Sequence, residues 1–358
     1  MKKRIFFFLF SFCFSACAQN VIYVVHPEAA PGNFSPGSPW YNVKEAVRRL
    51  GYDARWVKTS QGLKDYDYII YFDIFPWDIE NIKTHPKEKL IAFLWEPPTV
   101  LPFNYGNVFQ EYFSKIVTWA DSLVDNRRFF KFYYPVHVDF PRSVMPFEER
   151  KLCVMINRNK DSKHSCSLYG ERKKLIEFFE NNHSEDFDLY GYGWETAGFK
   201  NYRGTIGLGS SIDAWRGTKH ECMRNYKFYF AYENMQHIDG YVTEKIFDSF
   251  KAGCVPVYWG AQNITDYVPK SCFIDRRDFA NDEELYQFLK NMTEEEYGQY
   301  LNNIKYFLES SEALLFSWEY FVHVFLDIIE PGYNRYIVLS PRQLHIVEQI
   351  FQTQEIFS

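Results

Sequence analysis

Cysteine is scarce in this sequence, and what there is lies scattered. Two of the seven cysteines fall within the first 19 residues, and no C-x-x-C pair occurs anywhere. The remaining five do not suggest a disulfide framework, and a structural zinc site would need closely paired ligands. The nine histidines have no ligand-type spacing either. The sequence therefore predicts neither a disulfide scaffold nor a structural metal centre.

An excess of positive charge is also missing. Lys and Arg number 40 against 46 Asp and Glu, which gives a net charge of −6. Nucleic-acid partners usually require a basic surface, so no nucleic-acid partner is expected, although the count leaves a local patch open. We find no repeat and no low-complexity tract. With 46% apolar and 24% charged residues, the chain is globular and is not a disordered protein, a fibre or a coiled coil.

Long apolar runs are confined to the N-terminus. Lys2, Lys3 and Arg4 precede an apolar run over residues 5–18, which is short for a membrane-spanning helix. This pattern is typical of a signal peptide or a marginal signal-anchor, and residues 14–17 loosely resemble a lipoprotein cleavage site. The alternative is an apolar extension on a cytoplasmic protein that touches the membrane. We expect residues 1–19 to associate with a membrane, with a peripheral cytoplasmic protein as the alternative.

Beyond this leader, short apolar runs alternate with helical or polar stretches. Residues 21–25, 68–72 and 90–94 predict strands, and the amphipathic stretch 43–50 before Gly51 predicts a helix. Such alternation is typical of a parallel, doubly wound α/β domain.

A second alternating series follows the polar, proline-containing residues 141–152. We therefore expect a leader, two Rossmann-like α/β domains that face each other across a cleft, and a C-terminal tail, over residues 1–19, 20–145, 146–330 and 331–358. This fold class suits a nucleotide-sugar enzyme and many others, because a fold does not determine a function.

Glu96 directly follows the apolar run at 90–94, in the stretch Trp95-Glu96-Pro97-Pro98. Ligands of open α/β sheets gather beyond the carboxyl ends of the strands, so Glu96 is well placed for chemistry. Its apolar neighbours would raise its pKa toward the range of a general base. The structural alternative is a loop glutamate bonded to nearby N–H groups.

Residues 226–260 read as strand, polar loop, helix and strand, with Glu244 and Lys245 at the start of the helix. A helix N-terminus favours phosphate, and Lys245 adds a full charge in the first turn. Glu244 should point about 100° away from Lys245, toward a ribose diol. Taken alone, the pattern favours the structural alternative, in which Glu244 complements the helix dipole and Lys245 is a solvated surface charge. Asn234, after the strand, either binds a ligand or caps a turn.

Four blocks then occur in order: YKFYFAYEN, GYVTEK, AGCVPVYWGA and CFIDRRDF. They resemble the signature region of the α-1,3/α-1,4-fucosyltransferases, glycosyltransferase family 10. The resemblance is dense over residues 152–280, thinner over 90–140, and absent in the leader and the last 50 residues. It implies a GT-B fold and inverting transfer of L-fucose from GDP-fucose to a GlcNAc or Glc hydroxyl, with an α-1,3 linkage favoured and an N-acetyllactosamine-type or other glycan as acceptor.

The resemblance also implies roles for single residues. Glu96 would be the catalytic base, and the donor would lie against the second domain. Lys245 would meet the diphosphate and Glu244 the ribose, while Tyr241 and Asn234 would line the donor site. Arg172 would be a second phosphate contact, and Arg203 is a rival for that role because the loop before Arg172 varies in length.

No metal is expected to take part, because fixed cations and a helix N-terminus can stabilise the departing GDP. Two D-x-D patterns, at residues 65–67 and 186–188, are interpreted as structural. Two other functions stay open: a related GT-B transferase that uses another nucleotide sugar, and a non-catalytic glycan-binding protein on the same fold.

Overall fold

The computed structural model describes residues 20–28, 39–206 and 212–357. The predicted leader, residues 1–19, lies outside this part of the chain. Within the described ranges, no helix combines the length and the apolar character needed to cross a bilayer.

The first half of the chain folds around a six-stranded sheet in the order β2-β1-β3-β4-β5-β6, in which every neighbouring pair is parallel. The central strand β4 is buried at all five positions, as its unbroken apolar sequence LIAFL predicts for a strand covered on both faces. The strands are β1 (Asn20–Val25), β2 (Tyr52–Val57), β3 (Tyr68–Phe72), β4 (Leu90–Leu94), β5 (Lys115–Thr118) and β6 (Phe129–Lys131). The helices are α1 (Pro39–Arg49), α2 (Ile79–Ile82) and α3 (Asn107–Gln110).

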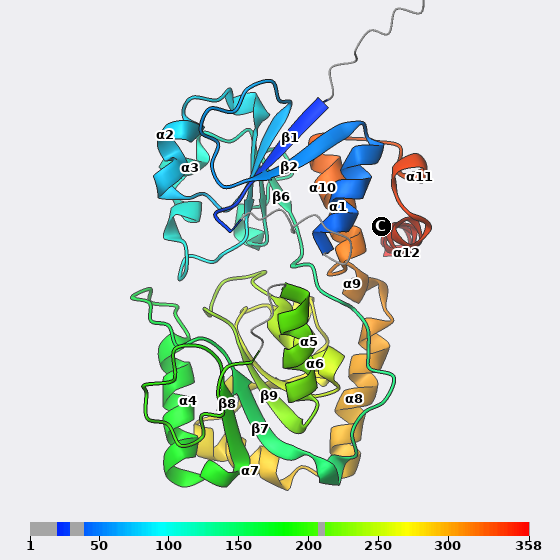
Figure 1. Cartoon of the computed structure of the whole chain (residues 1–358). Helices are drawn as coiled ribbons and strands as arrows, with labels where there is room; N and C mark the ends of the chain where they lie inside the picture. Colours follow the sequence, from blue (N-terminus) through cyan, green and yellow to red (C-terminus); the bar gives the residue numbers. More distant parts are fainter. Residues whose placement is uncertain (1–19, 29–38, 207–211, 358) are drawn as a thin grey trace, which may run out of the picture.

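The second half contains a five-stranded parallel sheet in the order β11-β10-β9-β7-β8. Its strands are β7 (Lys151–Ile156), β8 (Phe187–Tyr190), β9 (Tyr226–Tyr232), β10 (Val255–Trp259) and β11 (Ile274–Asp275). Its helices are α4 (Tyr169–Asn182), α5 (Ile212–Met223), α6 (Glu244–Ala252) and α7 (Asp282–Asn291). Two parallel sheets with helices around them confirm the expected α/β fold class, and Figure 1 shows one sheet in each half of the molecule.

The C-terminal helices return to the first half of the molecule. They are α8 (Glu294–Leu308), α9 (Ser311–Leu314), α10 (Trp318–Ile329), α11 (Arg335–Val338) and α12 (Pro341–Phe357). Helix α10 shares a core with the first sheet, through Phe321 and Phe325 against Phe93, and lies beside α1 (Figure 1). The sequence predicts that residues up to 330 belong to the second domain and that residues 331–358 form a tail. The structure differs because the apolar face of α10 covers the first sheet.

The chain thus crosses between the halves twice, and the two crossings run side by side. Val136 on the way out forms a parallel bridge with Ser317 on the way back, and its N–H donates to the Phe316 carbonyl at 2.7 Å. This pairing holds the two halves together at one edge and leaves the carboxyl ends of their strands to face each other.

Candidate active site

The second half contributes the N-terminus of helix α6. Thr243 is its N-cap, and the Thr243 hydroxyl accepts from the Lys245 N–H at 3.5 Å. The fully buried Glu233, just after β9, accepts from the Thr243 N–H at 2.9 Å and from the Thr243 hydroxyl at 2.8 Å. Gly260 leaves room for this carboxylate, since a Cβ there would lie 2.5 Å from the Glu233 Cγ. The Glu233 carboxylate therefore fixes the N-terminus of α6 through its hydrogen bonds to Thr243.

Lys245 is held between two carboxylates. Its Nζ lies 3.0 Å from an oxygen of Glu233 and 3.4 Å from one of Glu244, and its side chain is only 15% exposed. Burial alone would lower the pKa of Lys245, but the charges of Glu233 and Glu244 raise it above its ordinary value. Lys245 is therefore a fixed cation, and its interpretation as a solvated surface charge is contradicted. The tips of the Glu244 and Lys245 side chains meet at 3.4 Å, although the two residues are adjacent on the helix.

Arg172 supplies a second buried cation, from the first turn of α4. Its Nη2 donates to the Tyr232 carbonyl at 2.6 Å and to the Asn234 Oδ1 at 3.1 Å. Its Nε is buried and has no hydrogen-bond partner among the described residues. Burial lowers the pKa of Arg172. A buried guanidinium without a carboxylate partner in the described chain favours an anionic ligand.

The structure separates Arg172 from its rival. Arg203 donates from its Nε to the Asp188 carboxylate at 2.5 Å, and the same carboxylate accepts a hydrogen bond from the Lys151 Nζ at 2.8 Å. Asp186 pairs with Lys290 at 2.6 Å. Of the two arginines, only Arg172 contacts Asn234. Both acids of the D-x-D pattern at 186–188 form ion pairs with Lys or Arg side chains of the chain, as a structural role requires.

Glu96 stands on the other wall, at the carboxyl end of β4. It is half-buried, and none of the described residues forms a hydrogen bond or ion pair with its carboxylate. Burial raises the pKa of Glu96, while the positive charges of Lys160 and Lys245 oppose this rise and the charge of Glu244 adds to it. Lys245 and Glu244 belong to the opposite half of the molecule. The charge of the predicted cation on one domain therefore acts on the pKa of the predicted base on the other.

Tyr241 lies deeper than the sequence suggested. It is almost fully buried and belongs to the core of the first half, where its ring lies 4.6 Å from that of Trp119. Burial, and then the charge of Glu233, raise the pKa of Tyr241, and Glu96 contributes further. Tyr241 thus connects the loop after β9 to the first domain.

A polar cluster that the sequence analysis missed joins the two halves beside Tyr241. The Asp121 carboxylate accepts from Lys131 at 2.5 Å, from the Tyr267 hydroxyl at 2.6 Å and from Asn263 at 3.0 Å. Asn263 in turn accepts from the Gly240 N–H at 3.0 Å. No local signal could reveal this cluster, because Asp121 and Lys131 lie more than 100 residues before Asn263 and Tyr267. Glu233 was also missed, although it stands beside Asn234 at the end of a buried strand.

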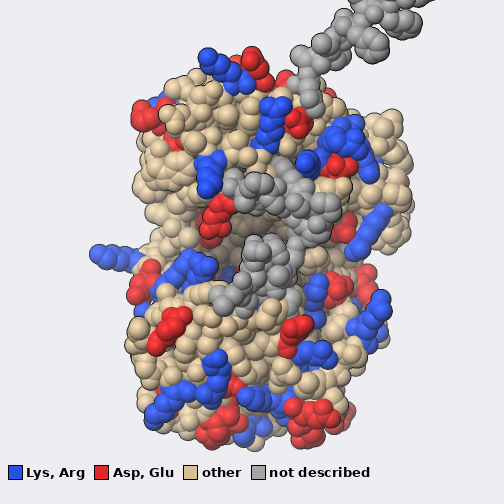
Figure 2. All heavy atoms as spheres, in the orientation of Figure 1, with Lys and Arg blue, Asp and Glu red and all other residues tan. Residues whose placement is uncertain are grey.

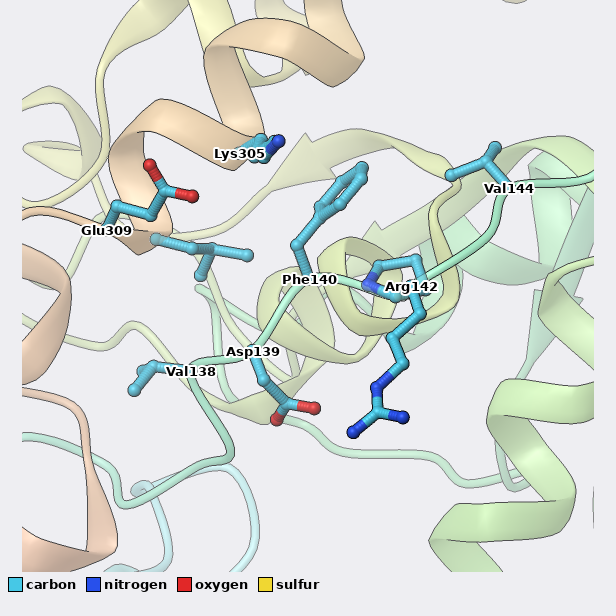
Figure 3. Close-up of a pocket in the computed structure, with 9 residues that line it drawn as sticks. Val138, Asp139, Phe140, Arg142, Val144, Lys305 and Glu309 are labelled. Carbon is cyan, nitrogen blue, oxygen red and sulfur yellow. The ribbon is translucent and has the colours of Figure 1, made fainter.

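The space-filling view shows a hollow between the two halves, with acidic side chains above its left end and basic side chains below (Figure 2). A separate cavity of about 450 Å³ lies elsewhere, between the linker around Phe140 and Arg142 and the end of α8 at Lys305 (Figure 3). None of the predicted site residues lines that cavity.

Comparison with known proteins agrees with this arrangement. The family model described as glycosyltransferase family 10 (fucosyltransferase) C-term matches residues 149–316. An alpha-(1,4)-fucosyltransferase of Arabidopsis thaliana is 40% identical over 78 residues, which is 22% of this chain and 19% of the relative. The 4-galactosyl-N-acetylglucosaminide 3-alpha-L-fucosyltransferase 9 of Rattus norvegicus is 26% identical over 235 residues, or 64% of this chain. The match spans 57% of that relative, less than two thirds of its length.

Solved structures show that the fold is shared. A crystal structure of an alpha1,3-fucosyltransferase with GDP has a TM-score of 0.57 at 14% identity and covers 91% of this chain and 94% of its own. One with GDP-fucose has a TM-score of 0.50 at 16% identity, with 88% and 91% covered. The fold class predicted from the resemblance, a GT-B arrangement of two Rossmann-like domains, is confirmed. Residues 149–316 of the chain are thus similar to the C-terminal domain of glycosyltransferase family 10, the fucosyltransferase family.

Proposed function

We propose that this protein transfers L-fucose from GDP-fucose to a GlcNAc or Glc hydroxyl of a glycan acceptor, with inversion at the anomeric carbon and an α-1,3 linkage favoured. One observation carries the proposal. Two buried cations, Arg172 and Lys245, belong to the second domain, and a raised-pKa carboxylate without a partner among the described residues, Glu96, faces them from the first. Relatives named as fucosyltransferases support the choice of donor.

The cationic wall would hold the nucleotide. Arg172 and the N-terminus of α6 would receive the diphosphate together with Lys245, and Glu244 would accept from the ribose hydroxyls. Asn234 keeps the Arg172 guanidinium in place by accepting from it. Because these charges are fixed before the reaction, they stabilise the negative charge that develops on GDP without having to reorganise.

The acidic wall would activate the acceptor. Glu96 takes the proton of the acceptor hydroxyl while the hydroxyl oxygen attacks the anomeric carbon of fucose. The bond from that carbon to the phosphate oxygen breaks, and its electron pair leaves with GDP. Attack from the face opposite the leaving group inverts the anomeric centre. A carboxylate suits this step only if its pKa is raised toward the working pH, which burial does for Glu96.

The direct test is incubation of the purified full-length chain with GDP-fucose and N-acetyllactosamine, followed by mass spectrometry of the product. We expect the acceptor mass to rise by one deoxyhexose residue, and linkage analysis to place it on the GlcNAc 3-hydroxyl. GDP-mannose and UDP-sugars offered in parallel should give no product. Transfer from one of those donors would contradict the donor assignment, and binding of the glycan without turnover of any donor would identify a glycan-binding protein.

A further inference from the structure

The backbone that carries Glu96 is held by a second buried carboxylate, Asp73, which lies just after β3. Its Oδ1 accepts from the Trp95 N–H at 2.6 Å, from the Glu96 N–H at 2.9 Å and from the Asn104 Nδ2 at 2.5 Å. Asp73 is 3% exposed and Asn104 is fully buried. Three donors on one buried oxygen make this a fixed junction between the ends of β3 and β4.

The junction also holds the other side of the Glu96 backbone. The Glu96 carbonyl accepts from the Asn104 Nδ2 and from the Tyr105 hydroxyl, each at 3.2 Å. Asn104 is itself fixed, since its Oδ1 accepts from the Ile74 N–H at 2.7 Å. Both backbone polar groups of Glu96 are thus occupied, whereas its carboxylate stays free of hydrogen bonds and ion pairs from the described residues. This is the arrangement that a positioned general base needs.

The backbone of Asp73 has an unfavourable conformation, which lets its side chain reach these donors. Its φ is 69°, in the left-handed region that side-chain-bearing residues rarely occupy, although Asp and Asn tolerate it best. Its own N–H still donates to the Phe93 carbonyl at 2.8 Å, so the left-handed turn begins while the chain is still paired with β4. The turn directs the Asp73 side chain at the two amides that follow β4.

Asp73 and Glu96 also interact through their charges. Burial raises the pKa of Asp73 to about 7, its hydrogen bonds act against this rise, and the charge of Glu96 adds to it. Among the described residues, the hydroxyls of Tyr105 and Tyr134 also lie near Asp73. The opposite wall presents four charged groups to Glu96, which are Lys160, Lys245, Glu244 and Arg158.

We propose that Asp73 is a positioning residue of the transfer reaction: it aims Glu96 by accepting hydrogen bonds from the Trp95 and Glu96 N–H groups and from Asn104. This inference rests on the proposed function of Glu96. It predicts that disturbing the junction lowers kcat and leaves GDP binding unchanged.

Asp73→Ala removes the accepting oxygen, so kcat should fall about 10²-fold while GDP affinity does not change. Asp73→Asn tolerates the left-handed turn and keeps an accepting oxygen, so it should recover most of that kcat. Asn104→Ala removes the other support of the Glu96 backbone and should also lower kcat about 10²-fold without weakening GDP binding.

Asp78→Asn is the matched control. Asp78 is fully buried in the same domain and accepts from Ser60 and Tyr71, but it does not contact Trp95 or Glu96. We expect a lower melting temperature and an unchanged kcat at saturating substrate. Full turnover in Asp73→Ala or in Asn104→Ala would overturn the positioning role. Glu96→Gln separates the two proposals: if it keeps full turnover, the proposed function fails, and if it loses turnover, the Asp73 and Asn104 variants decide this inference.

Discussion

The indole ring of Trp119, from the first domain, lies against the phenol ring of Tyr241, from the second, with 4.6 Å between the ring centroids. The indole N–H of Trp119 donates to the Trp95 carbonyl at 3.2 Å, one residue before Glu96. One side chain therefore touches both the segment that carries the candidate base and the loop that leads to helix α6. This contact joins the two walls, together with the Asp121 cluster and the pairing of Val136 with Ser317.

The first prediction concerns the packing of that loop against the first domain. A Cβ on Gly240 would lie 2.2 Å from the Trp119 carbonyl oxygen, and the Gly240 φ is +84°. Gly240→Ala should therefore lower the free energy of unfolding by about 1–3 kcal/mol through overpacking, beyond the cost of its backbone strain. It should also lower kcat, because Trp119 must move.

Gly51→Ala is the control for that experiment. Gly51 has a similar φ of +91° with no atom within 4 Å of the added Cβ, so it carries the strain without the overlap. The comparison is made by thermal unfolding and by fucose transfer. If the two variants lose the same free energy of unfolding and the same fraction of kcat, the contact between the domains tolerates the extra methyl group.

The second prediction concerns Glu96 and pH. Activity requires the deprotonated carboxylate, so kcat should fall as the pH drops through the pKa of Glu96, which lies above the ordinary 4.5 because of burial. The kcat of Glu96→Gln should be about 10²–10⁴-fold lower than that of the parent, and its remaining activity should not fall at acidic pH. Its affinity for GDP should equal that of the parent. Steady-state kinetics over a pH series would measure both effects, and full turnover by the variant would remove Glu96 as the base.

The third prediction concerns the anion site. Lys245→Ala should weaken GDP binding by at least tenfold, since a buried charge-assisted contact is lost. It should also destabilise the fold by about 3–5 kcal/mol, because Glu233 would stay buried without its cation. Calorimetric titration with GDP and thermal unfolding measure the two effects.

Lys251→Ala is the matched control on the same helix. Lys251 pairs with the exposed Asp139 at 3.3 Å, outside the site, so neither property should change much. If GDP affinity is the same in both variants, Lys245 is not a phosphate contact.

The fourth prediction concerns metal. The charge on departing GDP would be balanced by Arg172, Lys245 and the start of α6, so turnover should survive dialysis against EDTA. Product formation before and after chelation measures this. A loss of activity that added Mg²⁺ or Mn²⁺ restores would show that a cation takes part in the chemistry.

Much of this molecule could be predicted locally. The apolar runs at 68–72 and 90–94 form β3 and β4 at those residues, and the stretch that ends in Asn291 forms helix α7. Short-range signals decide such elements, because a continuous apolar run or a cap and an amphipathic face act within a few residues. Strands β5 and β6 were not predicted: they have four and three residues, and their pairing partners stabilise them more than their own sequences do.

The sequence by itself determined the types of most elements and the resemblance to the fucosyltransferases, and it pointed to Glu96, Arg172 and Lys245 as candidate site residues, since they stand in recognisable blocks. Only the tertiary structure decided what surrounds each group: Lys245 between two carboxylates, Tyr241 against Trp119, Asp73 beneath Glu96, and helix α10 on the first sheet. The physical reason is distance along the chain. Burial and long-range hydrogen bonds join residues tens to hundreds of positions apart, and a pKa or a docking contact exists only after those residues have met.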